Sequence, residues 1–342
     1  MTGLQTDSKR TPAAVLKLAH VAFQMGAIDR AFALYEEVLQ IAPENSVEAI
    51  SAQRRIVLSV PDWHARMMHD QHRNGAYDEA IRRAIKPGMR VFEIGTGAGL
   101  LAMMAARAGA AHVYTCEMNP AVAEVAREIV IRNGFADRIT VLSRHSRDVK
   151  PEDLGGPVDL LISEIVDDSI LGEGVLPAHE AAIPLLLKPG GQVIPARGIV
   201  RAALVSTRAA ETSWLDHIDG FDVRAFRKFL NHRNKAVSGD KVTRMASDPV
   251  DLFRFDLSCP NRVDPAQTTV SLRARGGAAN AVARWIALDL DEHTRYENAP
   301  DANFRSCWEI PLEPLAKPIL LAPDDHFVIH ASHDRAGIIV WV

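Results

Sequence analysis

The chain has 342 residues, of which 47% are apolar and 24% charged, and its formal net charge at pH 7 is -4. This composition is that of an ordinary globular protein, and the length allows two domains that each bury a core. The acidic balance argues against nucleic-acid binding as the main function, because phosphate binding needs clustered excess Lys and Arg. A basic run at residues 224–233 is explained more simply as a solvated helix face.

The cysteines and the N-terminus indicate the compartment. Cys116, Cys259 and Cys307 are far apart in the sequence, and no pair has metal-ligand spacing, so we expect no metal site and a reducing compartment. The first twelve residues are polar, and no apolar run approaches ~18 residues, so neither a signal peptide nor a membrane span is expected. We therefore expect a soluble, cytoplasmic protein that contacts no membrane.

Residues 1–60 are predicted to form an N-terminal helical segment. From Thr11 to about Val60 apolar residues recur at helical spacing, with breaks at Gly26 and at residues 43–45. The order of small and large residues fits one tetratricopeptide-like helix pair: Val15, Ala19, Gly26, Ala31, Tyr35, Val38 and Pro43. A solenoid needs about three such repeats. A helical hairpin packed on the next domain or on a second subunit is therefore favoured over a peptide-binding array.

Residues 61–195 alternate between short apolar runs and helical patterns. The candidate strands are Arg90–Ile94, His112–Cys116, Ile139–Leu142, Asp159–Ser163 and Gln192–Ile194. Helix-like segments such as Leu100–Ala108 and Pro120–Asn133 lie between them. This alternation implies a parallel sheet with crossover helices, so we predict an α/β, Rossmann-like domain.

Residues 196–342 have a different pattern, dominated by β-like runs. These runs are Ile199–Val205, Leu252–Leu257, Thr268–Leu272, Ala281–Leu288 and His326–His330. One helical pattern interrupts them near Phe221–Phe229. We predict a second, mostly antiparallel β domain, which makes the whole chain α/β followed by β.

A glycine-rich turn follows the first predicted strand of the α/β domain. Gly95, Gly97 and Gly99 come after an apolar strand and open a helix, as is typical where a backbone turns tightly against a ligand. Nicotinamide-binding domains have similar turns. Glu117 ends the next strand, about twenty residues on, where a carboxylate can accept both ribose hydroxyls. Glu93, two residues before the turn, is acidic as in the methyltransferase version, and residues 187–194 resemble the turn before the fifth strand of class I methyltransferases.

Two glutamates lie on the segment that follows the fourth strand. Glu164 and Glu173 are nine residues apart in the loop 163–174, at the carboxyl edge where an open sheet places ligands. Glycines on both sides of Glu173 allow the loop to curl, so that the two carboxylates face each other. A planar cation with several N–H donors, such as guanidinium, suits such a pair best. A helix cap and a solvated charge are the alternative explanation for the two residues.

Together these motifs resemble the protein arginine methyltransferase family and its double-glutamate loop, from about Trp63 to Val205. Residues 67–74 look like the family's helix over the cofactor, and residues 100–105 also match. Residues 172–177 and 145–149 are closest to the type III, monomethylating branch, the latter at the segment that contacts adenine. A weaker resemblance continues through residues 220–223 and 253–256 into the family's β-barrel.

The resemblance implies S-adenosyl-L-methionine as cofactor and arginine chemistry at the acceptor. Arg73 stands where the family binds the cofactor carboxylate, and His145 is expected to be scaffolding near the adenine. The implied cofactor residues are Met67, Arg73, Glu93, Gly95, Gly97, Gly99, Glu117, Met118 and Ser146. The implied acceptor residues are Asp70, Glu164, Glu173 and Trp308. Glu164 and Glu173 are the catalytic pair, whereas Asp70 either orients a neighbour or is a helix-surface charge.

Two features depart from the family pattern. Residues 306–308 look like the family's Thr-His-Trp loop, but Cys307 replaces the histidine that pairs with the position of Asp70. Trp308 remains and is able to stack on a guanidinium face. The segment from Thr212 to Lys241, where the family has its dimerisation arm, gives little sign of a long projecting arm. We therefore expect a homodimer whose contact comes from the N-terminal helices.

The leading hypothesis is an S-adenosylmethionine-dependent enzyme that methylates a guanidino nitrogen of arginine. Free L-arginine or a small arginine derivative is favoured over an arginine in a protein, because both departures affect the acceptor and assembly side. Methylation of another small amine and a non-catalytic cofactor-binding module are the alternatives. A module has no use for the glutamate pair.

Overall fold

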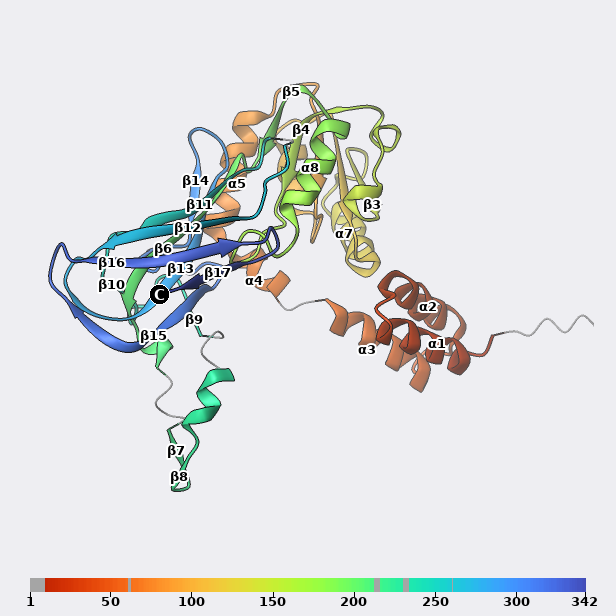
Figure 1. Ribbon diagram of the computed structural model, residues 1–342. Helices are drawn as coiled ribbons and strands as arrows, with labels where there is room; N and C mark the ends of the chain where they lie inside the picture. Colours follow the sequence, from red (N-terminus) through yellow and green to blue (C-terminus); the bar gives the residue numbers. More distant parts are fainter. Residues whose placement is uncertain (1–9, 61–62, 212–215, 230–233, 260) are drawn as a thin grey trace, which may run out of the picture.

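The computed structural model describes residues 10–60, 63–211, 216–229, 234–259 and 261–342. A parallel sheet with its helices lies next to a group of antiparallel strands, and three N-terminal helices stand apart from both (Figure 1). The predicted order of helices, α/β fold and antiparallel β fold is confirmed.

The parallel sheet has five strands in the order β3-β2-β1-β4-β5. Their bounds are β1 (Arg90–Ile94), β2 (His112–Glu117), β3 (Ile139–Ser143), β4 (Val158–Ser163) and β5 (Leu187–Ile194). The order reverses beside β1, which pairs with both β2 and β4. In such sheets ligands bind at the carboxyl ends of the strands where the order reverses, so this topology places the glycine turn and the glutamate loop side by side.

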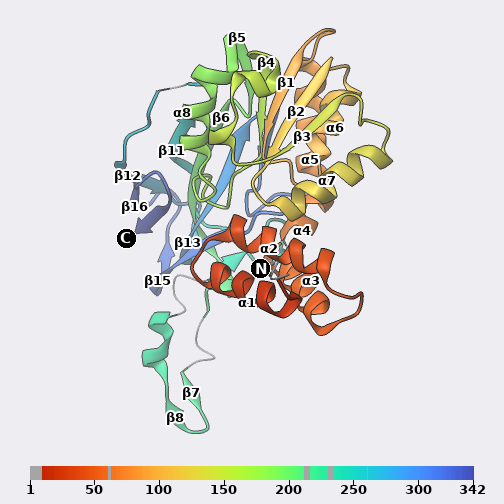
Figure 2. The same cartoon turned by 90° about the vertical axis from the view of Figure 1, so that its right-hand side faces the viewer.

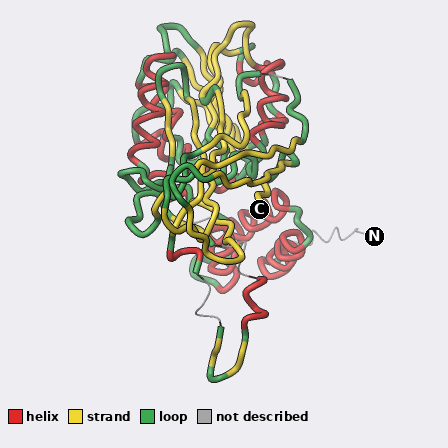
Figure 3. The backbone as a smooth tube through the Cα atoms, turned by 60° about the vertical axis from the view of Figure 1, so that its left-hand side comes forward, coloured by secondary structure: helices red, strands yellow, loops and turns green. Residues whose placement is uncertain are grey.

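Helices cover both faces of this sheet, as Figure 3 shows. They are α5 (Gln71–Ala84), α6 (Leu100–Arg107), α7 (Pro120–Arg132) and α8 (Val175–Leu186). Short 3-10 turns, η1 (Ser146–Asp148) and η2 (Pro151–Leu154), connect β3 to β4. The predicted turn at 187–191 instead belongs to β5, where the pairing with β4 shifts register between Val158 and Leu160.

After a cis peptide bond between Ile194 and Pro195, the chain enters antiparallel strands. One sheet has the order β10-β6-β13-β15-β9, with β11 beside β6 and β14 beside β13, and a second has the order β12-β16-β17. The strands are β6 (Arg197–Ser206), β9 (Lys235–Ala236), β10 (Arg244–Met245), β11 (Val250–Asp256), β12 (Ala266–Arg273), β13 (Gly277–Asp289), β14 (Arg295–Glu297), β15 (Ile310–Leu321), β16 (His326–His333) and β17 (Ile338–Trp341). A short turn, η3 (Arg208–Ala210), follows β6.

One large hydrophobic cluster spans the two sheet systems, and each system also has a smaller cluster of its own. Tyr77 and Leu160 of the parallel part belong to the same buried cluster as Ile286 and Ile329 of the antiparallel part. Because the core is continuous, the orientation of the antiparallel strands against the parallel sheet is determined by packing.

The N-terminal helices are α1 (Pro12–Gln24), α2 (Ile28–Ile41) and α3 (Val47–Ser59). Thr11 and Ser46 cap α1 and α3 by accepting backbone N–H bonds. The predicted small and large positions Val15, Ala19 and Tyr35 are buried in a separate core of this helical unit. The unit lies below α7, and α2 contacts that helix (Figure 2). A further helix, α4 (Trp63–His69), leads into α5.

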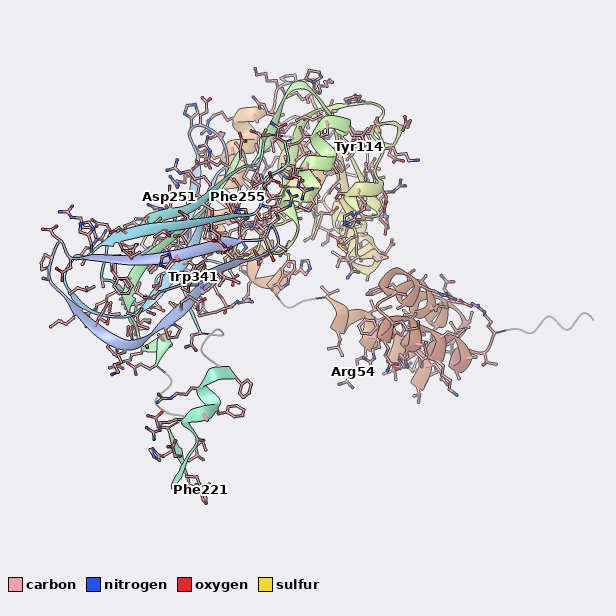
Figure 4. All side chains as sticks on the ribbon, in the orientation of Figure 1. Arg54, Tyr114, Phe221, Asp251, Phe255 and Trp341 are labelled. Atoms are coloured by element: carbon pink, nitrogen blue, oxygen red, sulfur yellow. The ribbon has the colours of Figure 1, made fainter. Side chains whose placement is uncertain are left out.

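The expectation that no arm projects from residues 212–241 is wrong. A hairpin of β7 (His217–Ile218) and β8 (Phe221–Asp222), followed by the 3-10 helix η5 (Arg224–Phe229), extends away from the antiparallel strands (Figures 1 and 2). Phe221 lies at its tip (Figure 4). The predicted helical pattern at Phe221–Phe229 is thus part strand and part 3-10 helix. Residues 212–215 and 230–233 of this segment lie outside the described residues.

Candidate active site

The glycine turn connects β1 to α6 and contains three glycines with left-handed backbone angles. Gly95, Gly97 and Gly99 all have positive φ, at 85°, 50° and 78°. A Cβ on Gly95 would lie 2.7 Å from the Cγ2 atom of Ile165, which is part of the glutamate loop. The turn therefore needs glycine here both for its backbone angles and for the close approach of that loop.

Glu117 ends β2 with its carboxylate against the glycine turn. One oxygen accepts the N–H of Gly97 at 3.1 Å, and the other accepts the N–H of Asn119 at 2.9 Å. Burial raises the pKa of Glu117, although these N–H bonds act in the opposite direction. The next residue, Met118, is 63% exposed. This arrangement places a carboxylate at the predicted ribose position and an apolar side chain beyond it.

Glu93 lies in the strand beneath the turn and is buried. Burial raises the pKa of Glu93 to about 8, and its Oε2 atom has no hydrogen-bond partner among the described residues. Beside it, Thr96 in the turn after β1 and Thr115 in β2 are joined by a hydrogen bond of 2.6 Å between their hydroxyls. A buried carboxyl with an unused oxygen is available to a ligand donor at the turn.

Arg73 and Glu164 form a buried ion pair between α5 and the loop after β4. The Nη2 atom of Arg73 lies 2.6 Å from the Oε2 atom of Glu164, and both side chains are at most 5% exposed. The Nη1 atom of Arg73 donates to Asn74 at 2.7 Å. Burial raises the pKa of Glu164 to about 7 in spite of Arg73. Its Oε1 atom is buried and has no partner among the described residues, so one side of the carboxylate is left for a further donor.

The loop that carries Glu164 and Glu173 is folded around Asp167. The Oδ1 atom of Asp167 accepts the N–H and hydroxyl of Ser169 and the N–H of Gly172. A Cβ on Gly172 would lie 2.1 Å from the Oδ2 atom of Asp167, so only glycine fits there. Ile170 is buried with φ of 73°, a strained conformation for a β-branched residue. The predicted tight curl of this loop is therefore produced by Asp167 and Gly172.

Glu173 lies on the exposed side of the same loop. Desolvation by the dense surroundings, and then the charges of Glu164, Asp167 and Glu117, raise the pKa of Glu173 to about 7. Those charges act on Glu173 because Glu164 and Glu117 are close to it. The fold therefore brings the charges of the two loop glutamates and of Glu117 at the end of β2 close enough to influence one another.

Trp308 supports this loop from the antiparallel side. Its indole Nε1 donates to the carbonyl of Val166 at 2.8 Å, and the side chain is buried. Its ring packs edge-on against Tyr296, with centroids 5.3 Å apart. The sequence suggested that Trp308 stacks on a guanidinium, whereas its described contacts hold the backbone of the glutamate loop.

Asp70 is buried rather than a helix-surface charge. It caps α5, since its Oδ1 atom accepts the N–H of Arg73 at 2.9 Å. Its Oδ2 atom accepts the backbone N–H of Cys307 at 2.9 Å and the phenol of Tyr296 at 2.8 Å. Tyr296 was missed from the sequence, because it belongs to no motif that points to the site, and Ser306 was assigned no role, although residues 306–308 resemble the family's Thr-His-Trp loop. In the sequence, Tyr296 is an aromatic residue between the charged residues Arg295 and Glu297, which by itself indicates no site.

Two other predicted cofactor residues lie on neighbouring elements. Met67 is in α4, directly before the capped helix, and Ser146 is buried at the start of η1. His145 precedes Ser146 and accepts the N–H of Arg147 at 3.1 Å, as a local scaffold does. Among the described residues, no group of three or more His, Cys, Asp or Glu is placed to hold a metal ion. Within the same residues, no helix is both long and apolar enough to cross a membrane.

Comparisons with known proteins match the chain to methyltransferases. The family models for ribosomal protein L11 methyltransferase (PrmA) and for protein-L-isoaspartate(D-aspartate) O-methyltransferase (PCMT) match residues 78–222 and 8–147. An arginine N(omega)-methyltransferase from Streptomyces achromogenes subsp. streptozoticus is 38% identical over 308 residues, which are 88% of this chain and 84% of that enzyme. The chain belongs to the arginine N-methyltransferase family.

Longer and more distant relatives share the same core. Protein arginine N-methyltransferase 7 from Danio rerio is 33% identical over 252 residues, which cover 67% of this chain but 36% of that protein. The chain therefore spans about a third of this relative. The PRMT1 enzyme–prozyme heterotetrameric complex with AdoHcy from Trypanosoma brucei has a TM-score of 0.70 at 22% identity, covering 80% of this chain and 88% of that chain. That likeness supports the fold.

This arginine methyltransferase depends on S-adenosylmethionine, and the residues at the turn fit that cofactor. The three positive-φ glycines leave the backbone open to a ligand, and Glu117 offers a carboxylate beside them. Arg73 supplies a cation at the third residue of α5, next to the capped end of that helix. These groups fit a nucleoside that carries an amino acid. Glu117 can accept from ribose hydroxyls, Arg73 can bind a carboxylate, and the glycine turn lets the ligand approach the backbone.

Proposed function

We propose that this enzyme transfers a methyl group to a guanidino nitrogen of free L-arginine or a small arginine derivative, held by Glu164 and Glu173. The observation that carries the proposal is the environment of Glu164, a buried carboxylate that already binds one guanidinium, that of Arg73, through Oε2. Its Oε1 atom has no partner among the described residues. Glu173 lies on the exposed side of the same loop, close enough for the charge of Glu164 to raise its pKa.

The chemistry follows from the pKa of guanidinium, which is above ~12 and so rules out cheap deprotonation in the ground state. Glu164 and Glu173 hold the cation by charge-assisted hydrogen bonds, worth roughly 1.5–3 kcal/mol each. They draw positive charge toward the nitrogens they contact, which leaves the remaining nitrogen more nucleophilic. S-adenosylmethionine supplies the methyl group as an electrophilic sulfonium.

Orientation is the larger contribution. Alignment of the acceptor nitrogen with the methyl group supplies about 7–11 kcal/mol of the activation barrier, whereas polarisation by the carboxylates is the smaller effect. In our proposal Arg73 binds the cofactor carboxylate, Glu117 the ribose, and Met67, Met118 and Ser146 the adenine side. Glu93 supports the turn from below.

Two observations favour a small acceptor. The relative that aligns with this chain over 84% of its length is named an arginine N(omega)-methyltransferase. The relatives named protein arginine N-methyltransferase 7 from Danio rerio and Oryza sativa subsp. japonica align over about a third of their length. Cys307 also departs from the family histidine on the acceptor side. Arginine in a peptide is the second candidate, because the exposed edge of Glu173 leaves the site open at the surface of the loop.

The test is mass spectrometry after incubation with S-adenosylmethionine and either free L-arginine or a peptide rich in Arg-Gly. We expect free arginine to gain ~14 Da, one methyl group, and the peptide to turn over at least ~10-fold more slowly, the ratio that 1.4 kcal/mol of discrimination produces. Faster turnover of the peptide would establish the second candidate. If neither gains mass, the arginine assignment fails. The same spectra count methyl groups, and a single addition supports the likeness to the monomethylating branch.

We further propose a division into residues 1–60, 61–195 and 196–342, and a homodimer. The N-terminal helices expose apolar side chains on α3, with Val47 79% and Leu58 68% exposed. The arm exposes Phe221 and Phe226. Exposed apolar patches of this kind mark contacts with another protein, so both surfaces are candidates for the contact between two copies.

A further inference from the structure

Tyr296 is the one residue of β14 whose side chain lies inside the shared core. It is 3% exposed, and its phenol oxygen lies 2.8 Å from the Oδ2 atom of Asp70 and 2.6 Å from the Oγ atom of Ser306. A carboxylate only accepts hydrogen bonds, so the phenol proton is committed to Asp70. The hydroxyl of Ser306 then supplies the proton for the second bond.

Asp70 uses its two oxygens for different tasks. Oδ1 caps α5 through the N–H of Arg73, whereas Oδ2 takes the phenol of Tyr296 and the backbone N–H of Cys307. The carboxylate is buried, and a buried charge is costly unless donors surround it. Tyr296 provides the one strong side-chain donor among the described partners of Oδ2.

Cys307 is a poor substitute for that donor. Its thiol also points at Asp70, but a thiol is a weak hydrogen-bond donor. Burial, and then the charges of Glu164 and Asp70, raise the pKa of the Cys307 thiol, so it stays protonated. The strong hydrogen bond from residue 307 to Asp70 is that of its backbone N–H, which any residue type except proline supplies. Asp70 therefore has a strong side-chain donor, Tyr296, without a histidine at position 307.

The bonds of Tyr296 lead to both members of the Arg73–Glu164 pair. Through Asp70 they reach the N–H of Arg73, three residues along α5. Through Ser306, which accepts the N–H of Trp308 at 3.0 Å, they reach the indole that holds Val166, two residues after Glu164. One phenol therefore connects the helix of the cofactor side to the loop of the acceptor side.

We propose that Tyr296 is a positioning residue for methyl transfer, and that it replaces the side chain of residue 307 as the donor that locks Asp70 to the antiparallel strands. It sets the alignment of Arg73 with Glu164 without touching substrate or cofactor. The inference rests on the proposed roles of Arg73 and Glu164.

The test compares Tyr296→Phe with two matched variants, in the full-length enzyme. Phe keeps the ring that packs on Trp308 and removes the hydroxyl alone. Cys307→Ala removes the thiol but keeps the backbone N–H. Tyr114→Phe makes the same chemical change in β2, where no hydrogen bond of the phenol is described. The readouts are kcat, KM for arginine, cofactor affinity by calorimetry, and the melting temperature.

We expect Tyr296→Phe to lower kcat about tenfold, the loss that one buried bond to a charged group produces, with KM and cofactor affinity changed less than about twofold. Cofactor affinity holds because the Oδ1 cap of α5 is untouched. Cys307→Ala and Tyr114→Phe should keep kcat within about twofold of the native enzyme. Wild-type kcat in Tyr296→Phe, or an equal loss in Cys307→Ala, would overturn the proposal.

Hydrogen–deuterium exchange provides a readout that needs no turnover. We expect amides of residues 164–174 to exchange faster in Tyr296→Phe than in the native enzyme or in Tyr114→Phe, because the Ser306–Trp308 support of the loop is weakened. Unchanged exchange there overturns the proposal even if arginine proves to be the wrong acceptor. A loss of kcat accompanied by an equal loss of cofactor affinity and a collapsed melting temperature would reduce Tyr296 to a general structural residue.

Discussion

The guanidinium of Arg73 lies 2.6 Å from the carboxylate of Glu164, and both groups are buried. One belongs to the helix α5 and the other to the loop after β4, which are 91 residues apart in the sequence. Loss of one partner from such a pair leaves an uncompensated charge in the interior, and this is more costly than the pair is stabilising. The pair therefore couples the stability of the fold to the proposed chemistry.

The two loop glutamates should differ in what their loss does to stability. We expect Glu164→Gln and Glu173→Gln both to abolish turnover while cofactor binding survives. Glu164→Gln should also lower the free energy of unfolding by on the order of 3 kcal/mol, because the Arg73 cation stays buried without a counter-ion. Glu173→Gln removes a carboxylate whose charge is disfavoured by desolvation and by its acidic neighbours, so it should not lower the free energy of unfolding. Denaturant titration and an activity assay measure the two effects. Near-normal methylation by either variant removes that residue from the mechanism.

The pH dependence follows from the raised pKa values. The pKa values of Glu164 and Glu173 are both about 7 in the folded enzyme, and both groups must be ionised to hold a guanidinium. We expect kcat/KM for arginine, which reports the free enzyme, to rise with pH through about 7 and then level off. Glu173→Gln should leave only a shallower dependence in whatever residual activity is measurable. A flat profile across about pH 6–8 would contradict the assignment.

The raised pKa values affect the stability of the fold in the opposite direction from activity, because stability falls where activity rises with pH. A carboxyl whose pKa is higher in the folded state than its ordinary value of 4.5 favours folding most while it is protonated. Its contribution is fully present below about 4.5 and is lost as the pH rises through about 7. We therefore expect the melting temperature of the enzyme without cofactor to fall between these values relative to that of Glu173→Gln. Parallel curves for the two proteins would refute the raised pKa of Glu173.

The curl of the glutamate loop should depend on one glycine. In Gly172→Ala the new methyl group would lie 2.1 Å from the Oδ2 atom of Asp167, so the loop must open and displace Glu173. We expect kcat to fall by about 100-fold or more, since misplacement by ~1 Å costs that much. Gly337→Ala is the control, because a Cβ there meets no atom within 4 Å. Equal activity of the two variants would show that the loop tolerates a side chain.

Arg73→Lys tests the cofactor end of the pair. Lysine keeps the charge but not the planar fork that now reaches both Asn74 and Glu164. We expect the Kd for S-adenosylmethionine, measured by calorimetry, to rise about tenfold, which corresponds to the loss of one charge-assisted bond. An unchanged Kd would place the cofactor carboxylate elsewhere.

Assembly is tested by removing each candidate surface in turn. We expect deletion of residues 1–58 to leave a monomer by light scattering, because the apolar face of α3 is lost. Phe221→Asp at the tip of the arm should weaken the dimer if the arm contributes, since a charge is placed in an apolar contact. A dimer that survives the deletion and dissociates in Phe221→Asp would assign the contact to the arm instead.

Much of the fold follows from local patterns in the sequence. The strand predicted at Arg90–Ile94 has the observed bounds, and β2, β3 and β4 differ from their predicted bounds by one residue, whereas β5 begins at Leu187 instead of Gln192. Apolar runs bounded by helical periodicity encode which face of an element is buried, and that information is local. The glycine turn and the spacing of Glu164 and Glu173 are equally local, because backbone conformation limits which residues such turns accept.

The arm was missed for a physical reason. Its strands are two residues long and its aromatic side chains are exposed, so neither a period of 2 nor one of 3.6 develops. Patterns of burial cannot reveal an element that buries little of itself. The sequence also did not predict the hydrophobic cluster that spans the parallel and antiparallel parts, because each part has enough apolar residues for a core of its own.

The sequence by itself determined the strand–helix order, the cofactor turn and the two glutamates, since each depends on residues close together in the chain. Only the tertiary structure decided that Tyr296 meets Asp70, across 226 residues, and that the indole of Trp308 binds the carbonyl of Val166, two residues after Glu164. Contacts of that kind depend on how two sheets pack around one core. No periodicity along the chain encodes them, because the partners are joined by packing and not by sequence distance.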